Sequence, residues 1–217
     1  MISVFIGVSL AFYLNQWSDE QKDKKAEEKI LLEIRTGLKQ DLQDMEVNIR
    51  GHQEGLKAVE FFKKLPFKQD TAQDSVMIKW FNLFRNFVVI QNSSGYESLK
   101  SKGLELIQDD SLRYAIIEVY DIEYEILEKL EEDYDEIQYH TNYFKPILDI
   151  LAENMVFTRK AGLTIAPLSL EPTVKNKYLN YLIRIEGNRH FTLGQYYRVQ
   201  EKLTKLIANL DEYLENH

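Results

Sequence analysis

The chain has 217 residues, of which 44% are hydrophobic, so it is long enough to bury one substantial core. Its net charge of −8 argues against a nucleic acid as the main partner, since phosphate binding depends on clustered Lys and Arg side chains. The absence of cysteine excludes disulfides, thiolate metal sites, cysteine nucleophiles and a lipid anchor on cysteine.

The first seventeen residues contain no charged side chain, and they end at Trp17, directly before the polar run SDEQKDKKAEEK. An apolar helix that closes with an interfacial aromatic residue is typical of a chain that leaves a bilayer. The sequence therefore predicts a membrane anchor over residues 1–17, in which Phe5, Leu10, Phe12 and Trp17 contact lipid.

The predicted anchor is short for a bilayer. A hydrocarbon core of about 30 Å requires roughly 20 helical residues, and residues 1–17 would supply about 25 Å. The sequence favours a span whose first turns precede Met1, and it leaves open a complete short span, a secretory signal peptide and a buried core helix. A signal peptide is disfavoured because no basic residue precedes Ile2.

The rest of the chain, residues 18–217, predicts an all-α domain. Apolar side chains recur at spacings near three and four from Leu31 to Val59, which predicts one long helix over residues 19–64 with a coiled-coil-like seam. We expect a second copy of the chain to pack against this seam. Three further helical regions are predicted, over residues 75–91, 111–144 and 173–216. The first of these is expected to be the most buried, and the last forms one helix or two. No strand is predicted, so the expected fold is an up-and-down bundle of about four long helices.

An acidic stretch covers most of the predicted helix over residues 111–144 and begins just before it. Between Asp109 and Glu136 there are twelve acidic residues against only Arg113 and Lys129. Such a field concentrates a basic partner or divalent cations, whereas the alternative interpretation is a solvated helix face. The predicted interaction surface comprises Glu128, Glu131, Glu132, Asp133, Asp135 and Glu136.

Two Glu–His pairs are candidates for a metal site. Glu136 with His140, and Glu186 with His190, stand four residues apart, so each pair can share one helix face. Di-iron bundles use a spacing one residue shorter, so exposed ion pairs are the favoured interpretation, and no metal or other cofactor is predicted. Without a phosphate loop, a zinc-protease motif or a nucleophile elbow, the sequence predicts no enzyme.

Two stretches, GVSLAFYLNQWSDEQK and NSSGYESLKSKGLELIQDDSLRYAIIEVYD, resemble an uncharacterised bacterial family of small single-pass membrane proteins. The second stretch contains an Asn-Ser-x-x-Tyr-Glu-x-Leu element ahead of a Gly, a Leu-Ile pair and a helix with paired acids. The resemblance implies an inner-membrane protein with a basic extension before its span. It implies no activity and no catalytic residues.

The side of the membrane stays open between two predictions. The lysines that follow the anchor, Lys22, Lys24, Lys25 and Lys29, would place the bundle in the cytoplasm. The basic extension that the resemblance implies favours the periplasm, which is preferred. We therefore expect a membrane-anchored interaction or scaffold module, with the bilayer and a second copy or protein partner as its contacts. The alternatives are a sensor-like ligand-binding bundle and a metal-binding helical-bundle enzyme.

Overall fold

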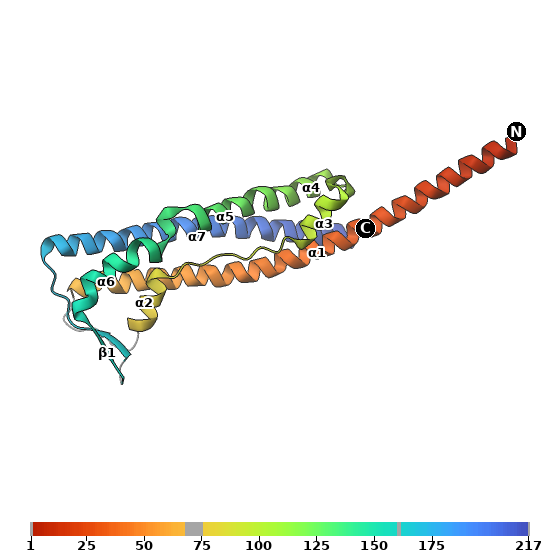
Figure 1. Ribbon diagram of the computed structural model, residues 1–217. Coiled ribbons are helices and arrows are strands. Elements are labelled where there is room, and N and C mark those ends of the chain that lie inside the picture. The colour runs from red at the N-terminus through yellow and green to blue at the C-terminus, as the bar shows by residue number, and fades with distance from the viewer. Residues whose placement is uncertain (1, 68–75, 160–161, 217) are drawn as a thin grey trace. The chain divides into compact units, whose positions relative to one another are not determined.

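A computed structural model describes residues 2–67, 76–159 and 162–216, with the side chains of residues 2–5 and 158 excepted. Most of these residues are helical (Figure 1). The α-helices are α1 (Ile2–Lys64), α2 (Val76–Phe84), α3 (Ser94–Lys102), α4 (Asp110–Ile117), α5 (Tyr124–Asp133), α6 (Lys145–Leu151) and α7 (Pro172–Asn216). Shorter helical turns are η1 (Leu65–Phe67), η3 (Leu104–Leu106), η4 (Glu118–Glu123), η5 (Asp135–Ile137), η6 (His140–Phe144) and η7 (Ala152–Asn154), of which η4 and η6 are π-helical.

The long helix predicted over residues 19–64 is confirmed, and α1 continues it without interruption to the N-terminal segment. Its seam is buried within the chain itself, since the side chains of Leu31 and Val59 have no exposed surface. The seam is therefore part of the core, and the expectation that it serves self-association is wrong. The last predicted helix is one uninterrupted element, α7.

The prediction of a transmembrane anchor is wrong. Within the described residues, no helix is both long enough and apolar enough to cross a membrane. The apolar part of α1 gives way to charged residues directly after Trp17. The prediction of a single-pass inner-membrane protein is wrong for the same reason. Contact with a bilayer surface stays a prediction.

The chain divides into two compact units, and the first comprises residues 1–42, 90–124 and 201–217. It contains the first part of α1, the helices α3 and α4, and the end of α7. A part-buried ion pair joins α1 to α7, with Arg35 3.0 Å from Asp211. The core side chains of this unit include Leu31, Ile34, Leu38, Leu99, Ile107, Ile116, Val119, Leu203, Leu206 and Leu210.

The second unit comprises residues 43–89 and 125–200. Its core side chains include Phe62, Trp80, Phe84, Leu130, Tyr143, Ile147, Tyr178 and Leu182. A two-stranded antiparallel hairpin, β1 (Met155–Thr158) and β2 (Gly162–Ile165), pairs Met155 with Ile165, and β2 contacts α2. The hairpin is a correction to the sequence analysis, because strands of four residues are too short for an alternating pattern to stand out.

The fold differs from four long helices in two further places. Residues 75–91 were predicted as one buried helix, but α2 ends at Phe84 and residues 85–93 run without regular secondary structure. The predicted helix over residues 111–144 is broken, because Tyr134 adopts an extended conformation with φ −82° and ψ 99°. In the described part of the chain α4, η4 and α5 form one continuous helical run over residues 110–133, and α1 and α7 are the other two long helices. The helical class is therefore right, and the count of four long helices is wrong.

Candidate functional site

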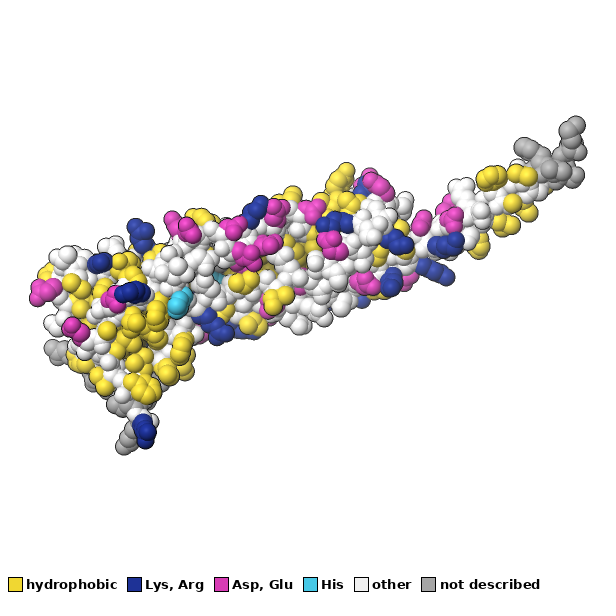
Figure 2. All heavy atoms as spheres, in the orientation of Figure 1, with side chains coloured by type: hydrophobic (Ala, Val, Ile, Leu, Met, Phe, Trp, Pro, Cys, Tyr) yellow, Lys and Arg dark blue, Asp and Glu magenta, His cyan; other side chains and the backbone are white. Residues whose placement is uncertain are grey.

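The most exposed apolar surface of the first unit lies on α1 over residues 6–17, called here the apolar segment. Figure 2 shows hydrophobic side chains along this part of the helix. The segment carries no charge, and the exposed fractions of its large side chains range from 51% at Val8 to 73% at Phe12. These side chains are Ile6, Val8, Leu10, Phe12, Tyr13, Leu14 and Trp17. Of the predicted lipid contacts, Leu10, Phe12 and Trp17 belong to this surface, and Phe5 lies outside the described side chains.

The apolar segment continues the packing pattern of α1. In the packed part of this unit, buried positions of α1 recur at alternating spacings of four and three: Glu27, Leu31, Ile34, Leu38 and Asp41. The same alternation, followed toward the N-terminus, passes Lys24 and Glu20 and then reaches Trp17, Tyr13, Leu10 and Ile6. We call these last four residues the exposed seam. Residues 6–25 are exposed except for the half-buried Ser18, so the rest of the unit leaves the seam uncovered.

The predicted acidic surface loses one of its six members. Glu131 is only 5% exposed, and its carboxylate accepts hydrogen bonds from the Val89 backbone N–H at 3.1 Å and from the Tyr196 hydroxyl at 2.5 Å. The remaining five, Glu128, Glu132, Asp133, Asp135 and Glu136, are exposed. Acidic side chains are spread widely over the face drawn in Figure 2. The surface stays a prediction for these five residues.

In both Glu–His pairs, one side chain contacts another residue of the chain. The His140 ring stacks on Phe144 with 4.6 Å between ring centroids, and Glu186 forms an ion pair with Lys63 at 3.0 Å. Neither pair gains a third ligand, because the described residues contain no group of three His, Cys, Asp or Glu side chains that could hold a metal ion.

A buried arginine forms the centre of a polar cluster in the second unit. Arg189 on α7 has no exposed surface, and its Nη2 donates to the backbone oxygens of Asn82 at 2.9 Å and of Leu83 and Arg85 at 3.1 Å each. These carbonyls lie at the C-terminal end of α2, where the helix leaves its last oxygens without internal donors and where a cation is favoured. The Arg189 side chain therefore caps the C-terminal end of α2.

The remaining neighbours of Arg189 fix its position. Its Nη1 lies 3.1 Å from His52 Nδ1, and its guanidinium stands 4.3 Å above the Tyr139 ring. Burial lowers the pKa of His52 to about 3, and the adjacent Arg189 lowers it further in the same direction. His52 is thus neutral at pH 7, with Nδ1 as the acceptor for the arginine. A Cβ on Gly55 would overlap the guanidinium, so a larger residue at this position of α1 would displace Arg189.

Side chains also form hydrogen bonds to residues 85–89 of this unit, which lack regular secondary structure. Asn48 donates from Nδ2 to the Val88 oxygen at 3.0 Å, and Glu131 accepts from the Val89 N–H. Burial raises the pKa of Glu131 to about 7, against the lowering effect of the hydrogen bonds from Tyr196 and Val89. Helical side chains therefore take the place of a neighbouring strand in satisfying these backbone groups.

The first unit repeats this arrangement with its own residues. Asp41 is 2% exposed, and it accepts from the Asn92 backbone N–H at 2.9 Å and from the Tyr124 hydroxyl at 2.6 Å. The Tyr120 hydroxyl donates to the Asn92 oxygen at 3.3 Å. Neither polar cluster was predicted from the sequence. The available signal was the presence of Asp41, His52 and Arg189 at otherwise apolar positions of the helical patterns.

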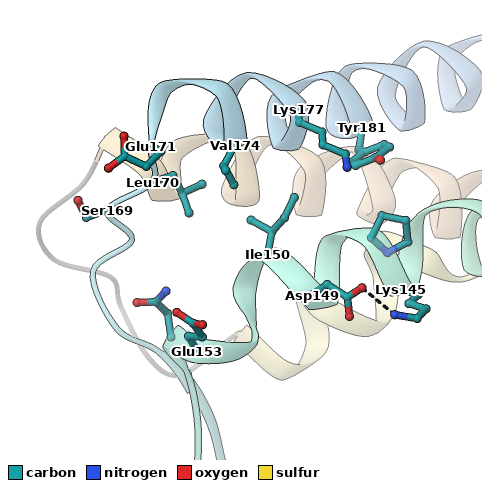
Figure 3. A pocket seen from close by; sticks show the side chains of 12 residues that line it. Lys145, Asp149, Ile150, Glu153, Ser169, Leu170, Glu171, Val174, Lys177 and Tyr181 are labelled. Atoms are coloured by element: carbon teal, nitrogen blue, oxygen red, sulfur yellow. Dashed lines mark hydrogen bonds and ion pairs between the residues drawn. The ribbon is translucent and has the colours of Figure 1, made fainter.

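A polar depression of about 520 Å³ lies beside α6 and the start of α7 (Figure 3). Lys145 and Asp149 face each other across 2.7 Å and neutralise one another. Glu153 and Glu171 stand well apart in the figure, so the carboxylates do not converge on one point. The depression lacks the convergent groups that catalysis or metal binding requires.

Comparisons with known proteins give a family but no activity. A family model described as a family of unknown function (DUF6090) matches residues 1–145, which is more than half of the chain. The expected resemblance to an uncharacterised family is confirmed at this level. No curated protein and no solved structure matches the chain.

Proposed function

We propose that this chain, which belongs to a family of unknown function (DUF6090), is a helical interaction module whose apolar segment pairs with the same segment of a second copy. One observation carries the proposal: the exposed seam of α1 has the spacing of a packed helix seam, yet its own unit leaves it uncovered. Such a surface is typical of an interface with another chain.

The seam side chains are large enough for their burial to stabilise a pair of segments. Burying a side chain such as Leu or Ile contributes about 1.5–3 kcal/mol, and a pair of segments would bury the seams of two copies. The loss of translational and rotational freedom on association costs about 4–15 kcal/mol. The segment is already helical and continuous with the packed part of α1, so little further ordering of its backbone is required.

A second copy suits the segment better than a charged partner does. Residues 6–17 contain no charged side chain, so identical segments meet without like-charge repulsion. Spacings of three and four allow the side chains of one helix to insert between those of the other. A two-fold interface of this kind uses the same patch on both copies. The resulting dimer would present two copies of the exposed acidic residues to further partners.

Cross-linking tests the pairing, because the chain contains no native cysteine. A single cysteine at Leu10 is expected to form a covalent dimer under mild oxidation if the segments run parallel. If they run antiparallel, the product forms instead between one copy with Leu10→Cys and another with Tyr13→Cys. The matched control is Val47→Cys, at an exposed position of the same helix outside the segment. Cross-linking at neither segment position, or equally at Val47, would overturn the proposal.

A further inference from the structure

An aromatic cavity of about 470 Å³ opens on the second unit between the end of α2 and the π-helical turn η6. It is lined by Trp80, Phe81, Phe84, Arg85, His140 and Phe144. Its volume lies in the range of small-molecule sites, about 300–1,000 Å³. π-Helical turns occur frequently at functional sites, and η6 supplies one wall of this cavity.

The floor of the cavity consists of rings that are fixed by mutual contact. Trp80 is 7% exposed and Phe84 is 4% exposed, and their ring centroids lie 4.9 Å apart. Phe144 contacts both, at 5.5 Å from Trp80 and 5.3 Å from Phe84. Phe81, by contrast, is 62% exposed at the rim. This arrangement offers ring faces and edges to a planar guest, with the exposed Phe81 ring available to cover it.

The two walls are tied together beside the cavity. The Asn86 amide oxygen accepts from the Tyr139 backbone N–H at 3.3 Å, and its Nδ2 donates to Gln138 Oε1 at 3.0 Å. Residues 85–86 are thereby held against the segment that leads into η6. The cavity is therefore built into the unit and does not depend on a ligand for its shape.

The rim carries a cation that the described residues leave without a carboxylate partner. Arg85 is exposed, and its guanidinium carbon lies 5.6 Å from the centroid of the Phe87 ring. That contact is with a ring and not with a hydrogen-bond acceptor, so the guanidinium N–H groups stay available to a ligand. In a chain with a net charge of −8, an arginine beside an aromatic cavity selects for an anion.

We propose that this cavity binds a small planar aromatic carboxylate, with its ring against Trp80, Phe84 and Phe144 and its carboxylate on Arg85. Arginine binds carboxylates through two parallel N–H···O bonds, a geometry that ammonium groups do not reproduce. His140, stacked on Phe144, extends the aromatic wall. This site is separate from the apolar segment of α1, and it gives the chain a ligand-binding role in addition to association.

The test uses 2-naphthoate as the probe and the full chain as the receptor. The protein has two tryptophans, so its ¹H–¹⁵N spectrum contains two indole N–H signals, which the variant Trp17→Phe assigns. We expect the Trp80 signal to shift on titration with a Kd on the order of 0.1–1 mM, while the Trp17 signal stays in place. A Trp80 signal unmoved at about 10 mM probe would overturn the proposal.

Two matched comparisons test the anion contact. The neutral amide 2-naphthamide is expected to bind the native protein about tenfold more weakly than 2-naphthoate, and Arg85→Gln to lose about tenfold in naphthoate affinity. Arg50→Gln serves as the control, since Arg50 is an exposed arginine of the same unit, 3.7 Å from Glu46. Equal binding of acid and amide, or equal affinity in both arginine variants, would contradict the assignment of Arg85.

Two further variants keep the outcome interpretable. Arg85→Lys retains the charge and is expected to bind with intermediate affinity, which separates loss of the contact from loss of the fold. Leu10→Glu, in the apolar segment, is expected to bind naphthoate like the native protein. Failure of pairing and failure of ligand binding therefore give different results.

Discussion

At the scale of single residues, the buried polar side chains decide where the main chain runs. Arg189 is a cation without exposed surface, and burial lowers its pKa to about 10. The cost of burying it is offset by three backbone oxygens at the end of α2 and by the Tyr139 ring. Arg189 therefore fixes the position of α2, and its charge is not presented at the surface.

A test of this role changes the glycine that makes room for the arginine. Gly55→Ala is expected to destabilise the protein by about 1–3 kcal/mol, because its methyl group overlaps the guanidinium. The control is Gly187→Ala, since a Cβ at Gly187 on α7 has no atom within 4 Å. That change is expected to stabilise by about 0.5–1 kcal/mol through helix propensity. Urea denaturation measures both, and equal effects would contradict the account.

Glu131 predicts a dependence of stability on pH. Its pKa is raised from 4.5 to about 7, so between these values the folded chain holds a proton that the unfolded chain has released. The free energy of unfolding should therefore fall as pH rises through this window, by up to about 1.4 kcal/mol per pH unit. Burial is the main cause, and the nearby carboxylates of Asp44 and Glu132 add to it.

The measurement is urea denaturation of the native protein and of Glu131→Gln between pH about 5 and about 8. The native protein should lose stability relative to the variant as pH rises. His52, with its pKa lowered to about 3, gives the opposite slope below its usual pKa of 6.5, but it is present in both proteins and cancels. Parallel curves for the two proteins would show that Glu131 does not titrate in this window.

At the scale of elements, residues 85–89 of the second unit, which lack regular secondary structure, depend on side chains of the helices for their hydrogen bonds. Asn48 is 6% exposed, and it supplies a donor to the Val88 oxygen. Asn48→Ala should cost about 1 kcal/mol, since it removes the part-buried hydrogen bond to the Val88 oxygen. The control Asn180→Ala removes an exposed hydrogen bond to the Asn176 oxygen and should stay within about 0.5 kcal/mol. Urea denaturation that gives the two variants the same stability would contradict this role of Asn48.

The sequence was informative about long helices and less so about this segment. The regular spacing from Leu31 to Val59 predicted α1 correctly, because its buried face follows from local positions alone. The apolar run that follows Phe84 was assigned to a helix, since a short apolar run does not distinguish helix from strand. Its hydrogen-bond partners lie far away in the chain, at Asn48, Glu131 and Tyr196.

The candidate sites were predictable to different degrees. The exposed residues Leu10 and Trp17 attract attention from sequence because no charge interrupts their surroundings, although their assignment to a transmembrane anchor was wrong. The aromatic cavity was not predictable, because Arg85 and His140 meet only after α2 and η6 pack together. Glu131 was assigned to an acidic surface, and only its burial reveals it as a core residue.

At the scale of the whole molecule, the central claim is that two copies associate through the apolar segment of α1. The segment combines a coiled-coil spacing, exposed apolar side chains and the absence of charge. Glutamate at Leu10 and Tyr13 places four carboxylates in the seam of a dimer, and burying them without partners costs more than the seam contributes.

Sedimentation equilibrium tests this claim most directly, because the mass of one chain is 25.6 kDa. We expect the native protein to sediment at twice this mass, Leu10→Glu/Tyr13→Glu at the mass of one chain, and the control Val47→Glu at twice the mass like the native protein. A native protein that stays at 25.6 kDa, or a double variant that remains a dimer, would contradict the account.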